Sequence, residues 1–174
     1  LAGSTGITTI TNQGSTADLT LNNLASLPTS VVLNTIDDNT TINLANGALS
    51  STTDDLAVTL QGTTTNAELI VTYASGSAND LETVSLVSDT AANILANFDT
   101  NGADVTTLEI TGDQDLTITA AIDTEITTVS AGSFTGDLSI TTGSAIDLTT
   151  TTGSGADTVV SSSGDDVIST GDGA

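Results

Sequence analysis

The sequence contains no lysine, arginine, histidine or cysteine, and these four absences exclude several functional classes before any motif is considered. Without a basic side chain, nothing can pair with a nucleic-acid phosphate or an anionic lipid headgroup, so nucleic-acid binding and adsorption to anionic membranes are excluded. Without cysteine, neither a disulfide nor a thiolate metal site can form. The chain also lacks an apolar run of about 18 residues, so no membrane-spanning helix and no membrane insertion are expected.

The same absences remove most catalytic groups. There is no imidazole base, no thiolate, no Schiff-base amine and no cation to stabilise an oxyanion. Paired carboxylates can cleave glycosides, but each acidic pair lies in turn-like sequence, and with two Phe, one Tyr and no Trp no aromatic platform for a sugar is near. We therefore expect a non-catalytic protein whose acidic pairs are solvated turn residues or metal ligands: Asp37-Asp38, Asp54-Asp55, Asp113 with Asp115, and Asp165-Asp166.

The charge is entirely of one sign. Twenty-two Asp and Glu residues give a net charge of −22, and no side-chain salt bridge can offset it. Each carboxylate must therefore be solvated, bonded to backbone N–H groups or neutralised by a bound cation. This composition favours a medium rich in divalent metal.

What the chain has in abundance is Thr, Ser, Asp, Asn, Gly and the aliphatic residues. Thr, Val and Ile are typical of β-strands, and 174 residues suffice for one domain, or two small ones, with an aliphatic core. Up to about residue 75, short alternating runs separated by polar turns predict a β-rich region, either a sandwich or an irregular solenoid. The expected strands there are Ile7–Ile10, Leu19–Leu21, Val31–Leu33, Thr41–Leu44, Val58–Leu60 and Leu69–Val71.

One segment allows a helix. In Asp89–Phe98, Asp89 is a possible N-cap, and Ile94, Leu95 and Phe98 would share a helical face. The alternative is a loop that packs Phe98 into the core. A β-solenoid region is predicted for residues 76–150, where the expected strands are Leu108–Ile110, Leu116–Ile118, Ile126–Val129, Leu138–Ile140 and Ile146–Leu148.

A short phrase recurs through the chain, as Asp18-Leu-Thr-Leu21, Asp115-Leu-Thr-Ile118 and Asp137-Leu-Ser-Ile140. Each copy places a turn carboxylate directly before a strand with two apolar residues on one face. A stack of similar coils requires this pattern.

The last stretch, residues 151–174, repeats with a period of nine. Gly155, Gly164 and Gly173 are nine apart, as are Asp157 and Asp166, and the apolar Val159 and Ile168 keep the same step. This stretch resembles the Gly- and Asp-rich nonapeptides of the RTX calcium-binding proteins. A Gly/Ser/Asp-rich linker that repeats by chance is the alternative.

The resemblance implies a parallel β-roll in which two nonapeptides form one coil and calcium lies between turns of successive coils on the same side. Glycine permits positive φ and close approach of carbonyls, and Asp supplies the hard oxygen that calcium prefers. The expected ligands are Gly155, Asp157, Gly164, Asp165, Asp166, Asp172 and Gly173, with Asp113 and Asp115 as either further ligands or a plain Asx turn. A site starting at Asp157 requires an aspartate just beyond Ala174, so we expect the chain to hold the start of a calcium array and no finished site. Because the sequence begins at Leu1 without Met and stops within a repeat, we also expect a processed product or a fragment of a longer protein.

A second resemblance extends from about Leu81 to Ala174. Thr- and Ser-rich segments such as Val105–Asp113 and Ile126–Ala131, followed by Gly153-Ser-Gly-Ala-Asp157, are similar to the calcium-dependent surface-layer proteins of Gram-negative bacteria. This similarity implies type I secretion, an extracellular location at the cell surface, self-assembly and a cell-envelope glycan as a candidate partner. The alternatives are a filamentous adhesin or biofilm matrix protein assembled head to tail, and the RTX region of a secreted hydrolase.

Overall fold

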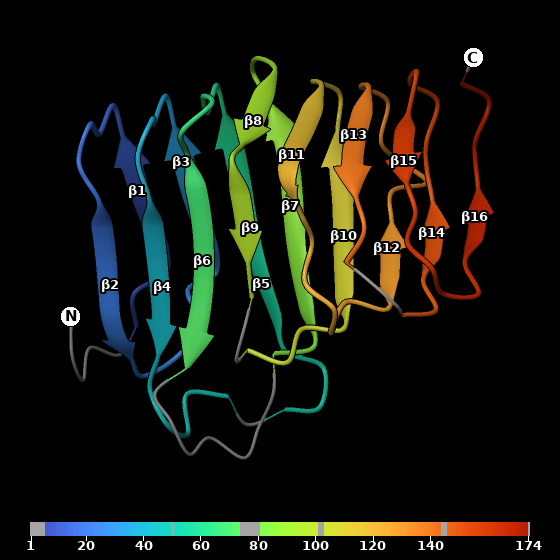
Figure 1. The fold of residues 1–174 in the computed structure, drawn as a ribbon. Coiled ribbons are helices and arrows are strands. Elements are labelled where there is room, and N and C mark those ends of the chain that lie inside the picture. Colours follow the sequence, from blue (N-terminus) through green and yellow to red (C-terminus); the bar gives the residue numbers. More distant parts are fainter. Residues whose placement is uncertain (1–5, 50, 74–80, 101–102, 144–145, 174) are drawn as a thin grey trace.

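The computed structural model describes residues 6–49, 51–73, 81–100, 103–143 and 146–173. Within these ranges it has sixteen β-strands and no helix. All strand pairs are parallel and form one eight-stranded and two four-stranded sheets (Figure 1). The all-β prediction and the solenoid alternative are therefore confirmed, and the pairing throughout is that of a parallel solenoid, including the region where a sandwich was possible.

The eight-stranded sheet forms one face of the solenoid. In spatial order its strands are β1 (Thr9–Gln13), β3 (Ser30–Asn34), β5 (Asp55–Gln61), β7 (Thr83–Asp89), β10 (Thr107–Gly112), β12 (Thr128–Ser130), β14 (Thr149–Thr151) and β16 (Val167–Ser169). The opposite face begins with β2 (Leu19–Leu24), β4 (Thr40–Leu44), β6 (Glu68–Tyr73) and β9 (Asn97–Asp99). It continues with β8 (Asn93–Leu95), β11 (Leu116–Ala121), β13 (Leu138–Thr141) and β15 (Thr158–Val160).

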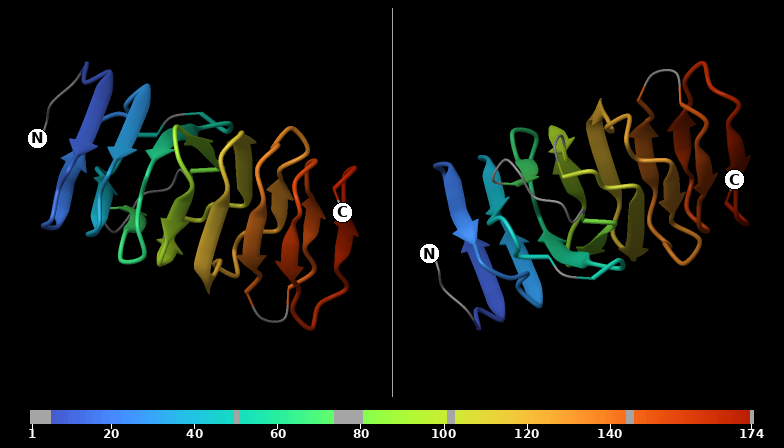
Figure 2. Two further views of the ribbon diagram at one scale, coloured as in Figure 1. Left: turned by 90° about the horizontal axis from the view of Figure 1, so that it is seen from above. Right: turned by 90° about the horizontal axis from the view of Figure 1, so that it is seen from below.

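The chain passes from one face to the other and back in each coil, as the two further views show (Figure 2). We call the turns that follow strands of the eight-stranded sheet the upper turns, and those that follow strands of the other face the lower turns; they form the upper and lower edges of Figure 1. The two four-stranded sheets meet at Ala96, which lies between β8 and β9. Its N–H donates to the Ala67 carbonyl and its own carbonyl accepts from the Ala120 N–H, so backbone bonding continues across the junction.

The core lies between the two faces. It consists of columns of side chains, in which residues at equivalent positions of successive coils stack on one another. One column contains Leu56, Val84, Leu108 and Val129, paired in register and all buried. Because side chains alternate along a strand, the residues between these positions face solvent, and they are mostly Thr, Ser and small residues. Burial of aliphatic columns is the main source of stability in such a stack.

The coils become shorter toward the C-terminus. Gln61 bonds to Asp89, 28 residues further along, whereas Leu148 bonds to Asp166, only 18 residues further along. A coil of 18 residues corresponds to two nonapeptides. The cross-section of the stack therefore narrows where the nine-residue period begins.

The predicted helix at Asp89–Phe98 is wrong. The segment contains the end of β7 followed by β8 and β9, and Thr90, in the turn between β7 and β8, has a positive φ of 71°. The buried Asn93 explains the outcome, because its amide bonds to backbone groups of the preceding coil and fixes a corner there. Phe98 is fully buried, but in strand β9 and not in a loop.

Two strands differ from the sequence expectation. The strand expected at Ile146–Leu148 is absent; these residues are in the lower turn, and the strand is β14, whose Thr149-Thr-Thr151 sequence has no apolar alternation to reveal it. Strand β7 was not predicted, although Val84 and Leu86 alternate with polar residues and carry the signal.

The eight-stranded sheet runs from β1 to β16 and so passes through all three predicted regions, 1–75, 76–150 and 151–174. None of the described segments forms a helix long and apolar enough to span a bilayer.

Candidate metal site

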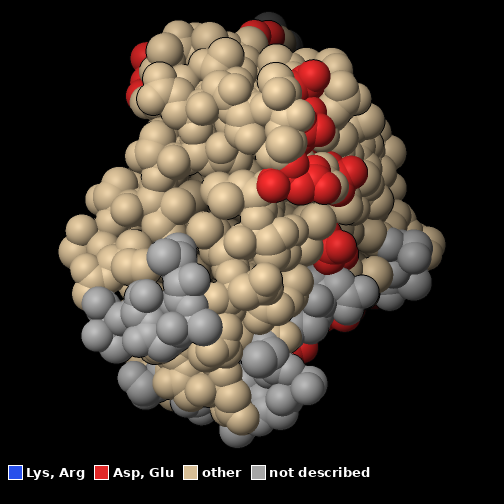
Figure 3. All heavy atoms as spheres, turned by 90° about the vertical axis from the view of Figure 1, so that its left-hand side faces the viewer, with Lys and Arg blue, Asp and Glu red and all other residues tan. Residues whose placement is uncertain are grey.

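The carboxylates are sorted to the edges of the solenoid. Apart from Glu109 in the middle of β10, every described Asp and Glu lies in a turn or is the first or last residue of a strand, and none is buried. Seen from the end that carries β1 and β2, acidic side chains gather in a few places and leave most of the visible described surface uncharged (Figure 3). The negative charge is therefore concentrated along the two rows of turns.

In the last upper turns, Asp137 and Asp157 each accept a backbone N–H from the coil that carries the other aspartate. Asp137 Oδ1 accepts the Ala156 N–H at 2.7 Å, and Asp157 Oδ1 accepts the Leu138 N–H at 3.0 Å. Because a carboxylate accepts strongly from backbone N–H groups, each aspartate satisfies an amide that the strand ladder leaves unpaired.

The lower turns contain the same arrangement. Asp147 Oδ1 accepts the Asp165 N–H at 2.8 Å, and Asp166 Oδ1 accepts the Leu148 N–H at 3.1 Å. Asp157 and Asp166 of the nonapeptides thus each accept an N–H from the preceding coil. Asp137 and Asp147, which each directly precede a leucine, accept an N–H from the following coil; we call these the backward and the forward bond.

In earlier coils the aspartates of the Asp-Leu phrases form the forward bond. Asp18 Oδ1 accepts the Asn39 N–H at 3.3 Å, and Asp115 Oδ1 accepts the Asp137 N–H at 2.9 Å. Two other carboxylates reach back to the preceding coil: Glu82 Oε2 accepts the Asp54 N–H at 2.7 Å, and Asp123 Oδ2 accepts the Thr100 N–H. Asp113, the other predicted ligand of this turn, accepts from Gln114 Nε2 at 3.0 Å. Asp113 and Asp115 therefore have protein partners of their own and lie outside the C-terminal turns.

The nonapeptide glycines are needed for close packing of the coils. A Cβ added to Gly155 would fall on the Gly136 carbonyl, one on Gly164 would fall on the Ile146 carbonyl, and one on Gly173 would fall on the Gly155 carbonyl. None of these three has a positive φ, so the expectation that they serve a left-handed turn is wrong. Glycine is required at these positions because each lies against a backbone carbonyl of the preceding coil.

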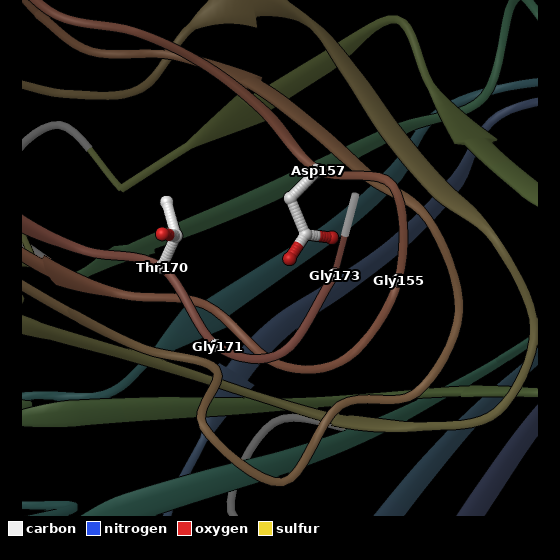
Figure 4. A pocket seen from close by; sticks show the side chains of 5 residues that line it. All are labelled: Gly155, Asp157, Thr170, Gly171 and Gly173. Carbon is white, nitrogen blue, oxygen red and sulfur yellow. The ribbon is translucent and has the colours of Figure 1, made fainter.

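A hollow of about 250 Å³ lies between two successive upper turns, and its lining residues are Gly155, Asp157, Thr170, Gly171 and Gly173. The Asp157 carboxylate points into the space that these residues enclose (Figure 4). Three of the predicted ligands, Gly155, Asp157 and Gly173, are therefore brought together, in the place between successive coils that the RTX resemblance implies.

The donor set of this hollow suits calcium in kind and falls short in number. A carboxylate, a hydroxyl and backbone carbonyls are hard oxygen donors, which calcium prefers, but calcium takes six to eight of them. Asp157 is the one carboxylate in the lining, and its Oδ1 already accepts from Leu138. Among the described residues there is no group of three or more acidic side chains that could hold a metal. The residues thus fit part of a calcium shell.

The remaining predicted ligands lie elsewhere. Gly164, Asp165 and Asp166 belong to a lower turn, on the opposite edge from the hollow, and Asp172 lies in the same upper turn as Gly171 and Gly173 with its side chain exposed. Thr170 and Gly171 line the hollow and were not predicted as ligands. The nine-residue period contained the signal for Gly171, because it follows Gly153 by two repeats.

Two carboxylates outside the C-terminal turns have perturbed acidity. Hydrogen bonds from the Thr64 hydroxyl, followed by the Asn66 amide, lower the pKa of Asp37. A bond from Gln61 Nε2 at 3.1 Å, followed by the Thr90 N–H, lowers the pKa of Asp89. Both aspartates lie in or beside upper turns and bond to neighbouring coils, so their charged form supports the stack.

Comparisons with known proteins assign no family to this chain. No protein-family model matches it, and no curated protein or solved structure is significantly similar to it. Functional inference therefore rests on the geometry described above.

Proposed function

We propose that this chain is a calcium-stabilised, non-catalytic structural protein of the cell exterior, a self-assembling surface-layer subunit or part of one. The observation that carries this proposal is the hollow between the last two described upper turns, into which Asp157 points and which Gly155, Thr170, Gly171 and Gly173 also line. Asp157, Thr170 and the carbonyls of the neighbouring glycines would hold the ion, together with oxygens from water or from further residues. Bound calcium would supply positive charge that no side chain of the protein provides.

The charge distribution supports the proposal. The carboxylates of successive coils are stacked along the edges, so like charges face one another at the separation of paired strands, about 4.8 Å. A divalent cation relieves this repulsion and stabilises the folded state in proportion to its occupancy. Secretion in an unfolded form and folding in a calcium-rich exterior would follow from the same dependence.

A head-to-tail filament, as in an adhesin or a biofilm matrix protein, is a second candidate. Strands β1, β2, β15 and β16 pair on one side only among the described strands, and none of them contains a charged residue. In a chain with a net charge of −22, uncharged edge strands permit parallel pairing with another subunit at low electrostatic cost.

The test has a binding arm and an assembly arm. Isothermal titration with calcium, with magnesium as the control ion, should show binding that Asp157→Asn weakens and that Asp104→Asn, at an exposed lower-turn position, leaves unchanged. Negative-stain microscopy should then show ordered material with calcium and none after chelation. Two-dimensional sheets would support the surface-layer role, and isolated fibres would support the filament. Failure to bind calcium, with a monomer indifferent to chelation, would overturn the proposal.

A further inference from the structure

The outer surface of the eight-stranded sheet, which faces away from the core, is built mainly from short, uncharged side chains. In β5, β7 and β10 the buried residues alternate with residues that point to solvent. Carboxylates border this surface at strand ends, as Asp55 does at the start of β5 and Asp89 at the end of β7. Inside these three strands the outward residues are Ala57, Thr59, Ser85, Val87, Glu109 and Thr111. Five of the six are short and uncharged, and Glu109 is the exception.

Glu109 stands in a column of small residues. It is exposed, and among the described carboxylates it is the one that lies inside a strand. The register places it between Ser85 of β7 and Ser130 of β12, and Ala57 and Thr151 continue the same column. Because Glu is depleted in strands, β-propensity does not account for its presence here.

No protein cation neutralises the Glu109 carboxylate, because the chain has no Lys, Arg or His. Its hydrogen-bond contact among the described residues is with Ser85 Oγ, 3.5 Å from Glu109 Oε2, whereas Asp55 Oδ1 lies 2.9 Å from the same hydroxyl. A hydroxyl has one hydrogen to donate, and the shorter bond directs it to Asp55. The Glu109 carboxylate therefore depends on water for its solvation.

Without Glu109 this outer surface would suit a second copy of the chain. Sheets with short side chains pack face to face about 10 Å apart. Eight strands about 4.8 Å apart and roughly five residues long cover roughly 600 Å² per copy, so a pair would bury about 1,200 Å², the lower limit of a specific interface. Each copy has a net charge of −22, located mainly at its turns, so two outer surfaces approach at lower electrostatic cost than two charged edges do.

We propose that Glu109 keeps the outer surfaces of two copies apart. Any face-to-face pairing that covers β10 removes this carboxylate from water with no cation to receive it, and burial of an unpaired charge is costly. Natural sheet proteins use charged side chains in a comparable way against edge-to-edge association. Contact between copies is then left to the ends and turns of the solenoid, which favours single layers or single filaments over stacks. The proposal does not depend on the calcium site.

Sedimentation velocity of the whole chain in chelator tests the proposal apart from any calcium-driven assembly. Glu109→Gln removes the charge at nearly constant volume, and Glu109→Ser reproduces the neighbours Ser85 and Ser130. Both variants should associate at a concentration roughly tenfold or more below any at which the unsubstituted chain does. Glu125→Gln, the same chemical change in an exposed lower turn, should leave the sedimentation unchanged. Glu109 variants that stay monomeric, or equal association of Glu125→Gln, would overturn the proposal.

Cysteine labelling locates the contact, since the chain has no cysteine of its own. With Glu109→Gln present, Ser130→Cys on the outer surface should react with a maleimide roughly tenfold more slowly when the variant associates. Thr119→Cys, at an exposed position of β11 on the opposite face, should react as fast as in the monomer. Protection of position 119 in place of position 130 would contradict the assigned surface. Protection of position 130 in a chain that retains Glu109 would show that this carboxylate does not keep the copies apart.

Discussion

Asp137 and Asp157 bond reciprocally across two coils: each carboxylate accepts a backbone N–H from the coil that carries the other. The nonapeptide aspartate therefore has a role in the fold without any metal, since it satisfies the amide of Leu138. A calcium ion in the adjacent hollow would share a carboxylate that is already held in place. The contribution of Asp157 to the fold can be separated from its proposed role in metal binding, because Oδ1 accepts the Leu138 N–H and Oδ2 is not used in that bond.

Asparagine at position 157 should separate the two roles. Asp157→Asn keeps an oxygen acceptor for the Leu138 N–H but removes the charge, so calcium-free stability should change by less than about 0.5 kcal/mol while the calcium response is lost. Asp157→Ala should lose both, with about 1 kcal/mol of destabilisation in chelator. Urea unfolding with and without calcium measures each effect. Equal loss of stability in both variants without calcium would show that the charge, and not the acceptor, maintains this junction.

The glycine columns should not tolerate a methyl group. Gly155→Ala places a Cβ on the Gly136 carbonyl, so we expect about 1–3 kcal/mol of destabilisation, concentrated in the last coils. Gly132→Ala is the matched control, because its Cβ would meet the Thr151 methyl at 3.4 Å and its φ is not positive. Thermal unfolding followed by circular dichroism compares the two. If Gly155→Ala did not lower the stability, Gly155 and the Gly136 carbonyl would have to lie further apart than they do in this structure.

The corner at Asn93 should be among the most sensitive positions of the solenoid. Its Oδ1 accepts the N–H groups of Gly62 at 2.7 Å and Thr63 at 3.0 Å, and its Nδ2 donates to the Ala91 carbonyl at 2.7 Å. Asn93→Ala leaves these buried groups unpaired, and a loss of about 3 kcal/mol is expected. Asn22→Ala, at an exposed position of β2, should change the free energy of unfolding by less than about 0.5 kcal/mol. If the two variants unfolded at the same urea concentration, the structural role assigned to Asn93 would be wrong.

Acid should destabilise the protein through Asp37 and Asp89. Their pKa values in the folded state are below the usual 3.8, so their contribution is present above that value and is lost as the pH falls through the lower folded-state values. The stabilisation that Asp37 and Asp89 contribute should therefore be lost below about pH 4. Gln61→Leu removes the main cause at Asp89 and should reduce this loss, which denaturant titrations at pH 3 and pH 6 would measure. An unchanged slope in the variant would show that other groups control acid unfolding.

Much of the fold could be read from the sequence. Alternating apolar residues located most strands, as at Val58–Leu60 within β5 and Leu138–Ile140 within β13, because side chains of a strand alternate between core and solvent. The Asp-Leu phrase correctly indicated stacked coils. The period of nine predicted that Gly155, Asp157 and Gly173 belong to one site, and all three line the same hollow. Where local alternation fails, as in the all-threonine β14, the sequence gives no strand signal.

The sequence by itself determined that this chain is all-β, has no basic side chain to neutralise its carboxylates, and repeats in a way that suits stacked coils. Only the tertiary structure decided which backbone amide each aspartate meets, that the glycines serve contact between coils, and that Asn93 turns a corner where a helix was predicted. The physical reason is distance along the chain. These contacts join residues about 20 to 30 positions apart, and their partners are fixed by the register between coils, which a local pattern does not contain.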